Sequence, residues 1–319
     1  MSNNSLEHAG ADPLMQLAYA QEAILAECLL WHPLEQCWWW TDIASASLHS
    51  WSSASRPASH YKLSDRVGSF AHCRSGRLLL GMAKWLCFTS QVEIVANAVK
   101  PLPVVDMVAV DPAEARTRIN DGRTDRSGNF VFGTMNEAEQ KRPIASFYQF
   151  SMRHGLRRLA LPAVAIANSI CFSLDGNTMY FSDTLTRRIM QCDYAADTAR
   201  VSNIRCFTEV ADVDGVAAYP DGAVIDRDGC LWNAQWGAAR VVQYAPDGTL
   251  LRSIIVPVKN PTCPAFGGVH LDVLMVASSR QEMSAEELLV MPHAGSLFAL
   301  TLSRPTGMAE TLFDDISSA

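Results

Sequence analysis

The stretch 175–184, DGNTMYFSDT, is the clearest copy of a unit that recurs along this chain. A polar turn is followed by a run of apolar, β-branched and aromatic residues and then by a second turn, which is the pattern of a short β-strand between turns. The other copies are SGRLLLGM at 75–82, SGNFVFGTM at 127–135, DGCLWNAQW at 228–236 and, without the turn glycine, HPLEQCWWWTDI at 32–43 and HLDVLMVASS at 270–279.

The spacing of the copies predicts the fold. The turn glycines Gly76, Gly128, Gly176 and Gly229 are 52, 48 and 53 residues apart, and six units of about 50 residues account for the 319 residues of the chain. A repeat of about 40 to 50 residues built from short strands is typical of a β-propeller. We therefore expect an all-β, six-bladed β-propeller.

The boundaries follow from the same count. Residues 13–319 are expected to form the single propeller domain, and residues 1–12 a flexible N-terminal tail. Part of the segment 14–25 is expected to supply a strand that closes the ring against the last blade.

Composition narrows the possible partners. The net charge of -7 disfavours binding to nucleic acid or to anionic lipid, and no apolar run is long enough to span a bilayer. The nine cysteines contain no C-x-x-C pair, which is typical of reduced thiols. The N-terminal residues lack the basic region and apolar run of a signal peptide, so none is expected. These features predict a cytoplasmic protein without nucleic-acid or membrane partners, and they leave the oligomeric state open.

The repeat also predicts which residues surround the axis. Residues at the same phase of successive blades are related by rotation, so they lie at the same height around the axis. The residues eight positions before the turn glycines, together with the one at the same offset from Glu35 in the first unit, are Gly68, Asn120, Asn168, Asp221 and Glu27. Two carboxylates and two carboxamides are therefore expected around one end of the axis.

Such a ring of oxygen atoms favours a cation. Asn120 and Asp221 also stand in common turn sequences, Asn-Asp-Gly and Asp-Gly, but their shared phase with Asn168, and the position of Glu27 in an apolar run, favour a site. Carboxylates that are buried close together repel each other, and a divalent cation would compensate them. Carboxylate and carboxamide oxygens suit Ca²⁺, Mg²⁺ or Mn²⁺.

Four longer stretches resemble one known family. They are LAECLLWHPLEQCWWWTDI at 25–43, RINDGRTDRSGNFVFGTM at 118–135, IANSICFSLDGNTMYFSDTLTRRIMQCDY at 166–194 and YPDGAVIDRDGCLWNAQWGAARVVQY at 219–244. They are similar to motifs of the gluconolactonase and regucalcin, or senescence marker protein, family of six-bladed propellers. The resemblance extends over nearly all of residues 20–302.

The resemblance implies that this chain hydrolyses a sugar lactone to the aldonic acid with a divalent metal ion. It implies Glu27, Asn168 and Asp221 as metal ligands, with Asp221 also acting on the attacking water. It further implies that Arg118 and Asn120 bind the lactone. Asp121 would hold their loop in shape. Ca²⁺ is the expected ion, with Zn²⁺, Mn²⁺, Mg²⁺ and Fe²⁺ as alternatives.

The sequence departs from the family pattern at several points. The glycine that follows the metal-binding asparagine is replaced by Ser169. A further substrate-contacting acid, found in some members after the Gly-Thr-Met motif, has no secure register among the charged residues that follow Met135, namely Glu137, Glu139, Lys141 and Arg142.

Two other functions remain open from the sequence. One is a propeller esterase or phosphotriesterase, and the other is a non-enzymatic calcium-binding or ligand-sensing protein. The presence of Asp221 favours catalysis, because a binding module needs no positioned base. The chain has no G-x-S-x-G motif, which favours direct water attack over a covalent intermediate.

Overall fold

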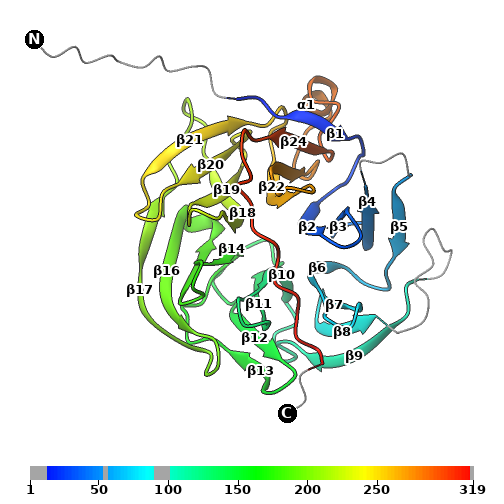
Figure 1. Cartoon of the computed structure of the whole chain (residues 1–319), viewed down its shortest axis with the longest axis vertical. Helices are drawn as coiled ribbons and strands as arrows, with labels where there is room; N and C mark the ends of the chain where they lie inside the picture. The colour runs from blue at the N-terminus through cyan, green and yellow to red at the C-terminus, as the bar shows by residue number, and fades with distance from the viewer. Residues whose placement is uncertain (1–12, 53–56, 90–100, 317–319) are drawn as a thin grey trace, which may run out of the picture.

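The computed structural model describes residues 13–52, 57–89 and 101–316; the tail expected at 1–12 lies outside these ranges. In the described residues the chain is almost entirely β-strand, with one α-helix, α1 (Ala285–Val290), and one 3₁₀ turn, η1 (Thr184–Thr186). The strands form six four-stranded sheets, arranged as blades around a common axis (Figure 1). The prediction of an all-β, six-bladed β-propeller is confirmed.

The blades are numbered here in chain order, and their neighbouring strands are antiparallel. Blade 1 contains β2 (Ala26–His32), β3 (Cys37–Asp42), β4 (Ser47–Trp51) and β5 (Ser59–Lys62). Blade 2 contains β6 (Val67–His72), β7 (Leu78–Met82), β8 (Trp85–Thr89) and β9 (Val104–Ala109). Blade 3 contains β10 (Thr117–Thr124), β11 (Phe130–Asn136), β12 (Phe147–Ser151) and β13 (Gly155–Arg158). Blade 4 contains β14 (Ala167–Phe172), β15 (Thr178–Asp183), β16 (Arg188–Ala195) and β17 (Arg200–Glu209). Blade 5 contains β18 (Tyr219–Ile225), β19 (Leu231–Trp236), β20 (Arg240–Tyr244) and β21 (Leu250–Ile255).

Blade 6 combines the two ends of the described chain. Its strands are β22 (Pro261–Gly267), β23 (Val273–Ser278), β24 (Leu297–Thr301) and β1 (Gln16–Tyr19), in the order β1-β24-β23-β22. The register pairs Gln16 with Ala299 and Leu17 with Phe298. The strand expected between residues 14 and 25 therefore exists, and it closes the ring.

The hydrophobic core is divided among the blade interfaces. The described residues form six buried clusters, and each cluster is shared by two neighbouring blades. In the cluster between blades 1 and 2, for example, Trp39 and Tyr61 of blade 1 stack on each other. The same cluster includes Leu80 of blade 2. This arrangement explains how one domain of this length buries its core, because each blade packs only against its neighbours.

The helix was not expected from the sequence. It lies in the connection between β23 and β24, and its first turn is closed by a capping box. The Ser284 hydroxyl accepts a hydrogen bond from the Glu287 backbone, while the Glu287 carboxylate accepts one from the Ser284 backbone. None of its side chains is fully buried, so its sequence has no apolar stripe from which a helix could be predicted.

The innermost strand of every blade has a register irregularity near its beginning. The shifts fall between Glu27 and Leu30, Val67 and Ser69, Ile119 and Gly122, Asn168 and Cys171, Pro220 and Ala223, and Pro261 and Pro264. A β-bulge redirects the side chains around it and interrupts the ladder. The ring positions derived from the repeat all lie at or beside these bulges.

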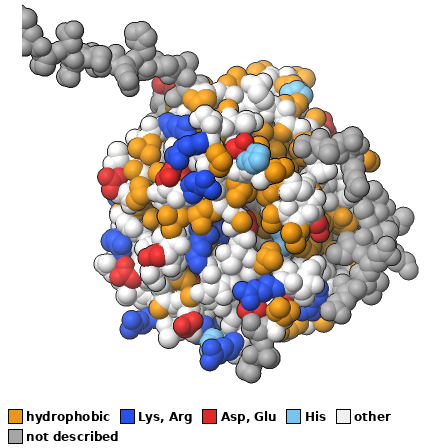
Figure 2. All heavy atoms as spheres, in the orientation of Figure 1, with side chains coloured by type: hydrophobic (Ala, Val, Ile, Leu, Met, Phe, Trp, Pro, Cys, Tyr) orange, Lys and Arg blue, Asp and Glu red, His pale blue; other side chains and the backbone are white. Residues whose placement is uncertain are grey.

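The C-terminal segment, residues 303–316, crosses the other end of the axis (Figure 1). Phe313 is completely buried against Phe88 and Phe150, and its backbone bridges that of Cys73. Asp315 forms an ion pair with Arg77 at 2.9 Å. Figure 2 shows this face, on which charged side chains of both signs are interspersed with hydrophobic side chains.

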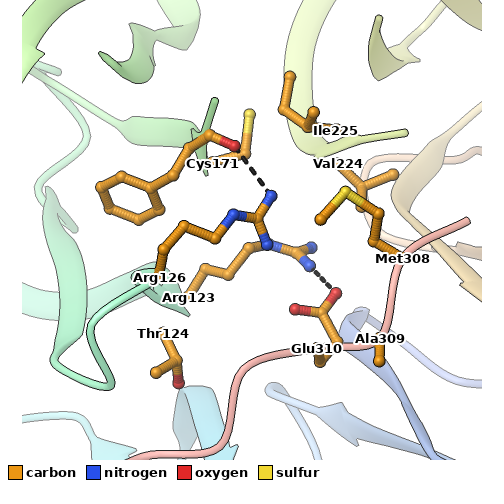
Figure 3. Close-up of a pocket in the computed structure, with 10 residues that line it drawn as sticks. Arg123, Thr124, Arg126, Cys171, Val224, Ile225, Met308, Ala309 and Glu310 are labelled. Carbon is orange, nitrogen blue, oxygen red and sulfur yellow. Dashed lines mark hydrogen bonds and ion pairs between the residues drawn. The ribbon is translucent and has the colours of Figure 1, made fainter. Parts of the chain in front are cut away.

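A small pocket lies beneath the C-terminal segment. Arg123, at the axis, forms an ion pair with Glu310 of that segment (Figure 3). The cavity volume of this pocket is about 10 Å³, which is room for roughly one water molecule. This pocket is therefore too small for a sugar-sized ligand.

We predict that Phe313→Ala lowers the free energy of unfolding by about 3 kcal/mol, because it empties a fully buried aromatic site. Denaturant unfolding followed by tryptophan fluorescence measures the loss. Ile316→Ala, at a position that is 63% exposed, is the control and should change stability by less than about 0.5 kcal/mol. Equal stabilities of the two variants would show that the C-terminal segment does not pack as described.

Candidate active site

The predicted ring residues lie together at the end of the axis where the innermost strands begin. Glu27, Asn120, Asn168 and Asp221 lie on β2, β10, β14 and β18, and all but the half-buried Glu27 are buried. The turn glycines follow the other ends of these strands, next to the C-terminal segment. The candidate site and that segment are therefore at opposite ends of the axis.

The backbone at the bulges explains a departure from the family pattern. Ser169, which stands where the family has glycine, has φ 60°, in the left-handed region that favours glycine. Its hydroxyl donates to the Asp221 carbonyl at 2.7 Å and lies 3.0 Å from the Ser182 hydroxyl. These hydrogen bonds compensate for the unfavourable φ and join blade 4 to blade 5.

A chain of hydrogen bonds fixes the two carboxamides. Arg118 Nη1 donates to Asn120 Oδ1 at 2.8 Å, and Asn120 Nδ2 donates to Asn168 Oδ1 at 3.1 Å. Asn168 Nδ2 then donates to the Thr184 hydroxyl at 2.8 Å, which donates to the Pro220 carbonyl at 3.0 Å. The chain connects blades 3, 4 and 5, so the orientation of each amide is determined by its neighbours.

Three carboxylates from different blades influence one another. Burial raises the pKa of Glu27 well above its usual value, and the charges of Asp221 and Asp121 raise it further; Arg118 opposes them. Burial, followed by the charge of Asp121, likewise raises the pKa of Asp221. The carboxylates of blades 1, 3 and 5 are thus close enough for mutual repulsion, as the repeat predicted for Glu27 and Asp221.

Asp121 connects two innermost strands. Its Oδ2 accepts a hydrogen bond from the Ile170 backbone N–H at 2.8 Å, across from β10 to β14. Burial raises its pKa to about 6, against the effect of this hydrogen bond and of the Arg123 charge. Arg118 and Asn120 lie on the bulged strand β10 and not in a loop, so this contact is of the kind that would hold that strand in shape.

Glu137, which the sequence left unassigned, lies beside Arg118. It follows β11 directly, and its Oε1 lies 3.4 Å from Arg118 Nε. Arg66 binds the same carboxylate. Glu139, Lys141 and Arg142 have no such contact with Arg118 among the described interactions, so Glu137 is the one of these four residues that contacts Arg118. Its place at the end of an innermost hairpin is the signal that could have distinguished it.

The residues present fit a hard divalent cation by their chemistry. Glu27 and Asp221 supply two buried or half-buried carboxylates that repel each other, and Asn168 supplies a carboxamide. Within the described residues no group of three or more His, Cys, Asp or Glu side chains is arranged to hold a metal. The predicted set contains only two such side chains, so an ion here would rely on Asn168 and on water for its remaining ligands.

The comparison with known proteins identifies the family. The family described as "SMP-30/Gluconolactonase/LRE-like region" matches residues 25–280. The chain belongs to this family of six-bladed propellers, as its motifs predicted.

Individual relatives agree with this class. The chain is 40% identical to L-arabinolactonase of Azospirillum brasilense, over 91% of this chain and 92% of that protein. It is 31% identical to 6-deoxy-6-sulfogluconolactonase of Pseudomonas putida, over 92% and 96%. The structure of the calcium-binding protein regucalcin from Agrobacterium tumefaciens superposes with a TM-score of 0.82 at 27% identity, over 94% and 99%. Together with the family match, these relatives confirm the prediction that the chain is a lactonase.

No helix in the described part of the chain is long and apolar enough to cross a membrane.

Ser169 provides a test of the bulge geometry. Ser169→Ala removes the hydroxyl contacts and keeps the strained φ, so we expect it to lower the free energy of unfolding by about 1 to 2 kcal/mol. Ser169→Gly removes the same contacts but relieves the left-handed strain of about 1 kcal/mol, so its stability should be close to that of the native protein. Urea unfolding compares the two variants, and an alanine variant at least as stable as the glycine variant would contradict the assignment.

Proposed function

We propose that this protein hydrolyses an aldonolactone to the aldonic acid in a reaction that depends on a divalent metal ion, Ca²⁺ in the first instance. The observation that carries the proposal is the convergence of Glu27, Asn168 and Asp221 at one end of the axis, beside Arg118 and Asn120. The identity with an L-arabinolactonase makes a pentonolactone the first substrate to test, and hexonolactones follow.

Glu27, Asn168 and Asp221 would hold the metal ion. When bound, a divalent cation polarises a carbonyl oxygen and lowers the pKa of water. The Asp221 carboxylate would accept the proton of the attacking water. Burial keeps this carboxylate away from bulk solvent, which strengthens its electrostatic interactions with the reacting groups.

The substrate would lie on the blade 3 side of the ring. Arg118 is 6% exposed and keeps its charge although burial lowers its pKa to about 10. Its guanidinium would donate hydrogen bonds to lactone oxygens, and its contact with Asn120 Oδ1 would keep it in place. The contact between Asp121 and the Ile170 N–H would hold the bulged part of β10 that carries these residues. Direct attack by water requires no covalent intermediate.

The compartment is part of the proposal. All nine cysteines are free thiols, which supports a reducing environment such as the cytoplasm.

Metal removal and replacement tests the proposed function. The protein is stripped with a chelator, Ca²⁺, Mn²⁺, Mg²⁺, Zn²⁺ or Fe²⁺ is restored separately, and proton release is followed on a panel of aldonolactones, with spontaneous opening subtracted. We expect metal to restore activity and Asp221→Ala to lower kcat by at least about 100-fold, because it removes both a ligand and the base.

Asp228→Ala, an acidic turn residue on blade 5 that pairs with Arg304, is the matched control and should retain activity. Full turnover by the chelated protein would refute the metal-dependent mechanism. Faster turnover of an aryl ester or an organophosphate than of every aldonolactone would instead identify an esterase or phosphotriesterase.

Stability should depend on pH in a way that metal changes. The raised pKa values of Glu27 and Asp221 mean that ionising them in the folded, metal-free protein costs stability. This cost is absent below their unfolded pKa values near about 4 and grows as the pH rises through the raised folded values. A bound cation removes it, so the gain in melting temperature on adding Ca²⁺ should be larger at pH 8 than at pH 5. Thermal unfolding at both pH values measures the gain, and an equal or smaller gain at pH 8 would be evidence against the site.

A further inference from the structure

Blade 2 contributes to the rim of the site in a different way from its neighbours. Its ring position is Gly68, and a Cβ there would lie 2.3 Å from the Ile119 carbonyl oxygen and 2.7 Å from that of Asn120. The adjacent strand β10 therefore leaves no room for a side chain at this phase. Arg66, two residues earlier and directly before β6, is a charged side chain of blade 2 that reaches blade 3 at this part of the rim, where it pairs with Glu137.

Arg66 holds Glu137 with both of its terminal nitrogens. Nη1 donates to Glu137 Oε1 at 2.5 Å, and Nη2 donates to Oε2 at 3.0 Å. This side-on pairing is the geometry in which guanidinium and carboxylate are most strongly oriented. The Glu137 backbone is held as well, because its N–H donates to the Arg116 carbonyl at 2.8 Å.

Glu137 in turn connects Arg66 to the predicted substrate residues. The oxygen that binds Arg66 Nη1 also lies 3.4 Å from Arg118 Nε, and Arg118 donates to Asn120. A continuous series of contacts thus runs from blade 2, through a carboxylate of blade 3, to the carboxamides of the ring. Arg66 is the outermost member of this series, and its side chain is 38% exposed.

The charge of Glu137 is stabilised in this setting. Partial burial alone would raise its pKa, but the hydrogen bonds from Arg66 and the charge of Arg118 outweigh it and bring the pKa below the usual value. The carboxylate is therefore ionised at neutral pH and acts only as a hydrogen-bond acceptor. Each oxygen has further acceptor capacity beyond the arginine contacts, which hydroxyl groups of a sugar can use.

We propose that Arg66 is a positioning residue for substrate selection: its two-point contact fixes Glu137 so that the carboxylate accepts hydrogen bonds from hydroxyl groups of the bound lactone. This role rests on the proposed lactonase function. Arg66 acts through Glu137 and does not touch the reacting carbonyl. It therefore favours polyhydroxylated lactones over lactones without hydroxyl groups, because a site built to bind hydroxyl groups discriminates against substrates that lack them.

The test compares Arg66→Met, Arg66→Lys, Glu137→Gln and the double variant Arg66→Met/Glu137→Gln in the metal-loaded, full-length protein. Steady-state kinetics are measured on the best aldonolactone and on γ-butyrolactone, which carries no hydroxyl group. We expect Arg66→Met to raise KM for the aldonolactone about 10-fold and to change kcat less than about 3-fold. Lysine should rescue KM only in part, because it keeps the charge without the two-point geometry.

The double variant separates positioning from an independent role. If Arg66 acts through Glu137, adding Arg66→Met to Glu137→Gln should change KM less than about 2-fold. The kcat/KM for γ-butyrolactone should be unchanged by Arg66→Met. Arg205→Met, which breaks a similarly exposed ion pair with Asp193 on blade 4, is the control and should leave both substrates unaffected.

The possible failures are distinguishable. An unchanged KM in Arg66→Met, multiplicative effects in the double variant, or an equal loss on γ-butyrolactone would overturn the role of Arg66 while leaving the lactonase intact. Absence of aldonolactone turnover in the native protein would overturn both proposals. Misfolding is monitored by the melting temperature, which should stay within about 3 °C of the native value because an exposed ion pair contributes little to stability.

Discussion

Glu27, Asp121 and Asp221 come from three different blades; the charges of Asp121 and Asp221 raise the pKa of Glu27, and the charge of Asp121 raises that of Asp221. Bringing them together costs free energy that no hydrophobic contact in the ring returns directly. The cost is sustained because each carboxylate sits on an innermost strand held between two neighbouring blades, whose cores are buried independently of the site. The same strands begin with bulges, which allow these side chains to project at the end of the axis instead of following the regular alternation of a sheet.

The two ends of the axis differ for a related reason. At one end, the bulged backbone supplies polar groups, and hydrogen bonds such as that from Ser169 to the Asp221 carbonyl hold neighbouring blades in register. At the other end, the tight turns between the first two strands of each blade provide a platform for the C-terminal segment, and Phe313 is buried on it. Buried polar groups therefore gather at one end of the axis, and apolar packing by the C-terminal segment covers the other.

The sequence was informative where the repeat was informative. The regular spacing predicted the six blades, and the phase of the turn glycines located Glu27, Asn120, Asn168 and Asp221 on equivalent bulges, because rotation relates these positions. Glu137 could not be assigned in this way. It lies beyond the end of β11, outside the repeated unit, and its position depends on contacts with Arg66 and Arg118.

Other features fell outside the pattern for similar physical reasons. Helix α1 has no buried face, so no apolar periodicity marks it. The C-terminal segment contacts blades that precede it by more than 200 residues, as the hydrogen bond between Arg74 and Asp314 across 240 residues illustrates. Contacts of this kind depend on the tertiary arrangement and leave no local signal in the chain.

The pairing of β1 with β24 also has a consequence for how the molecule is made. Gln21 and Ser296 are hydrogen-bonded although they are 275 residues apart. During synthesis, blade 1 leaves the ribosome long before the strands of blade 6 that lie beside it in the folded protein. Glu27 therefore lies in an incomplete ring until those strands have been synthesised. Chain entropy opposes such distant closure and slows it. The site residues at that end of the axis therefore come together as a complete set only after β1 and β24 have closed the ring.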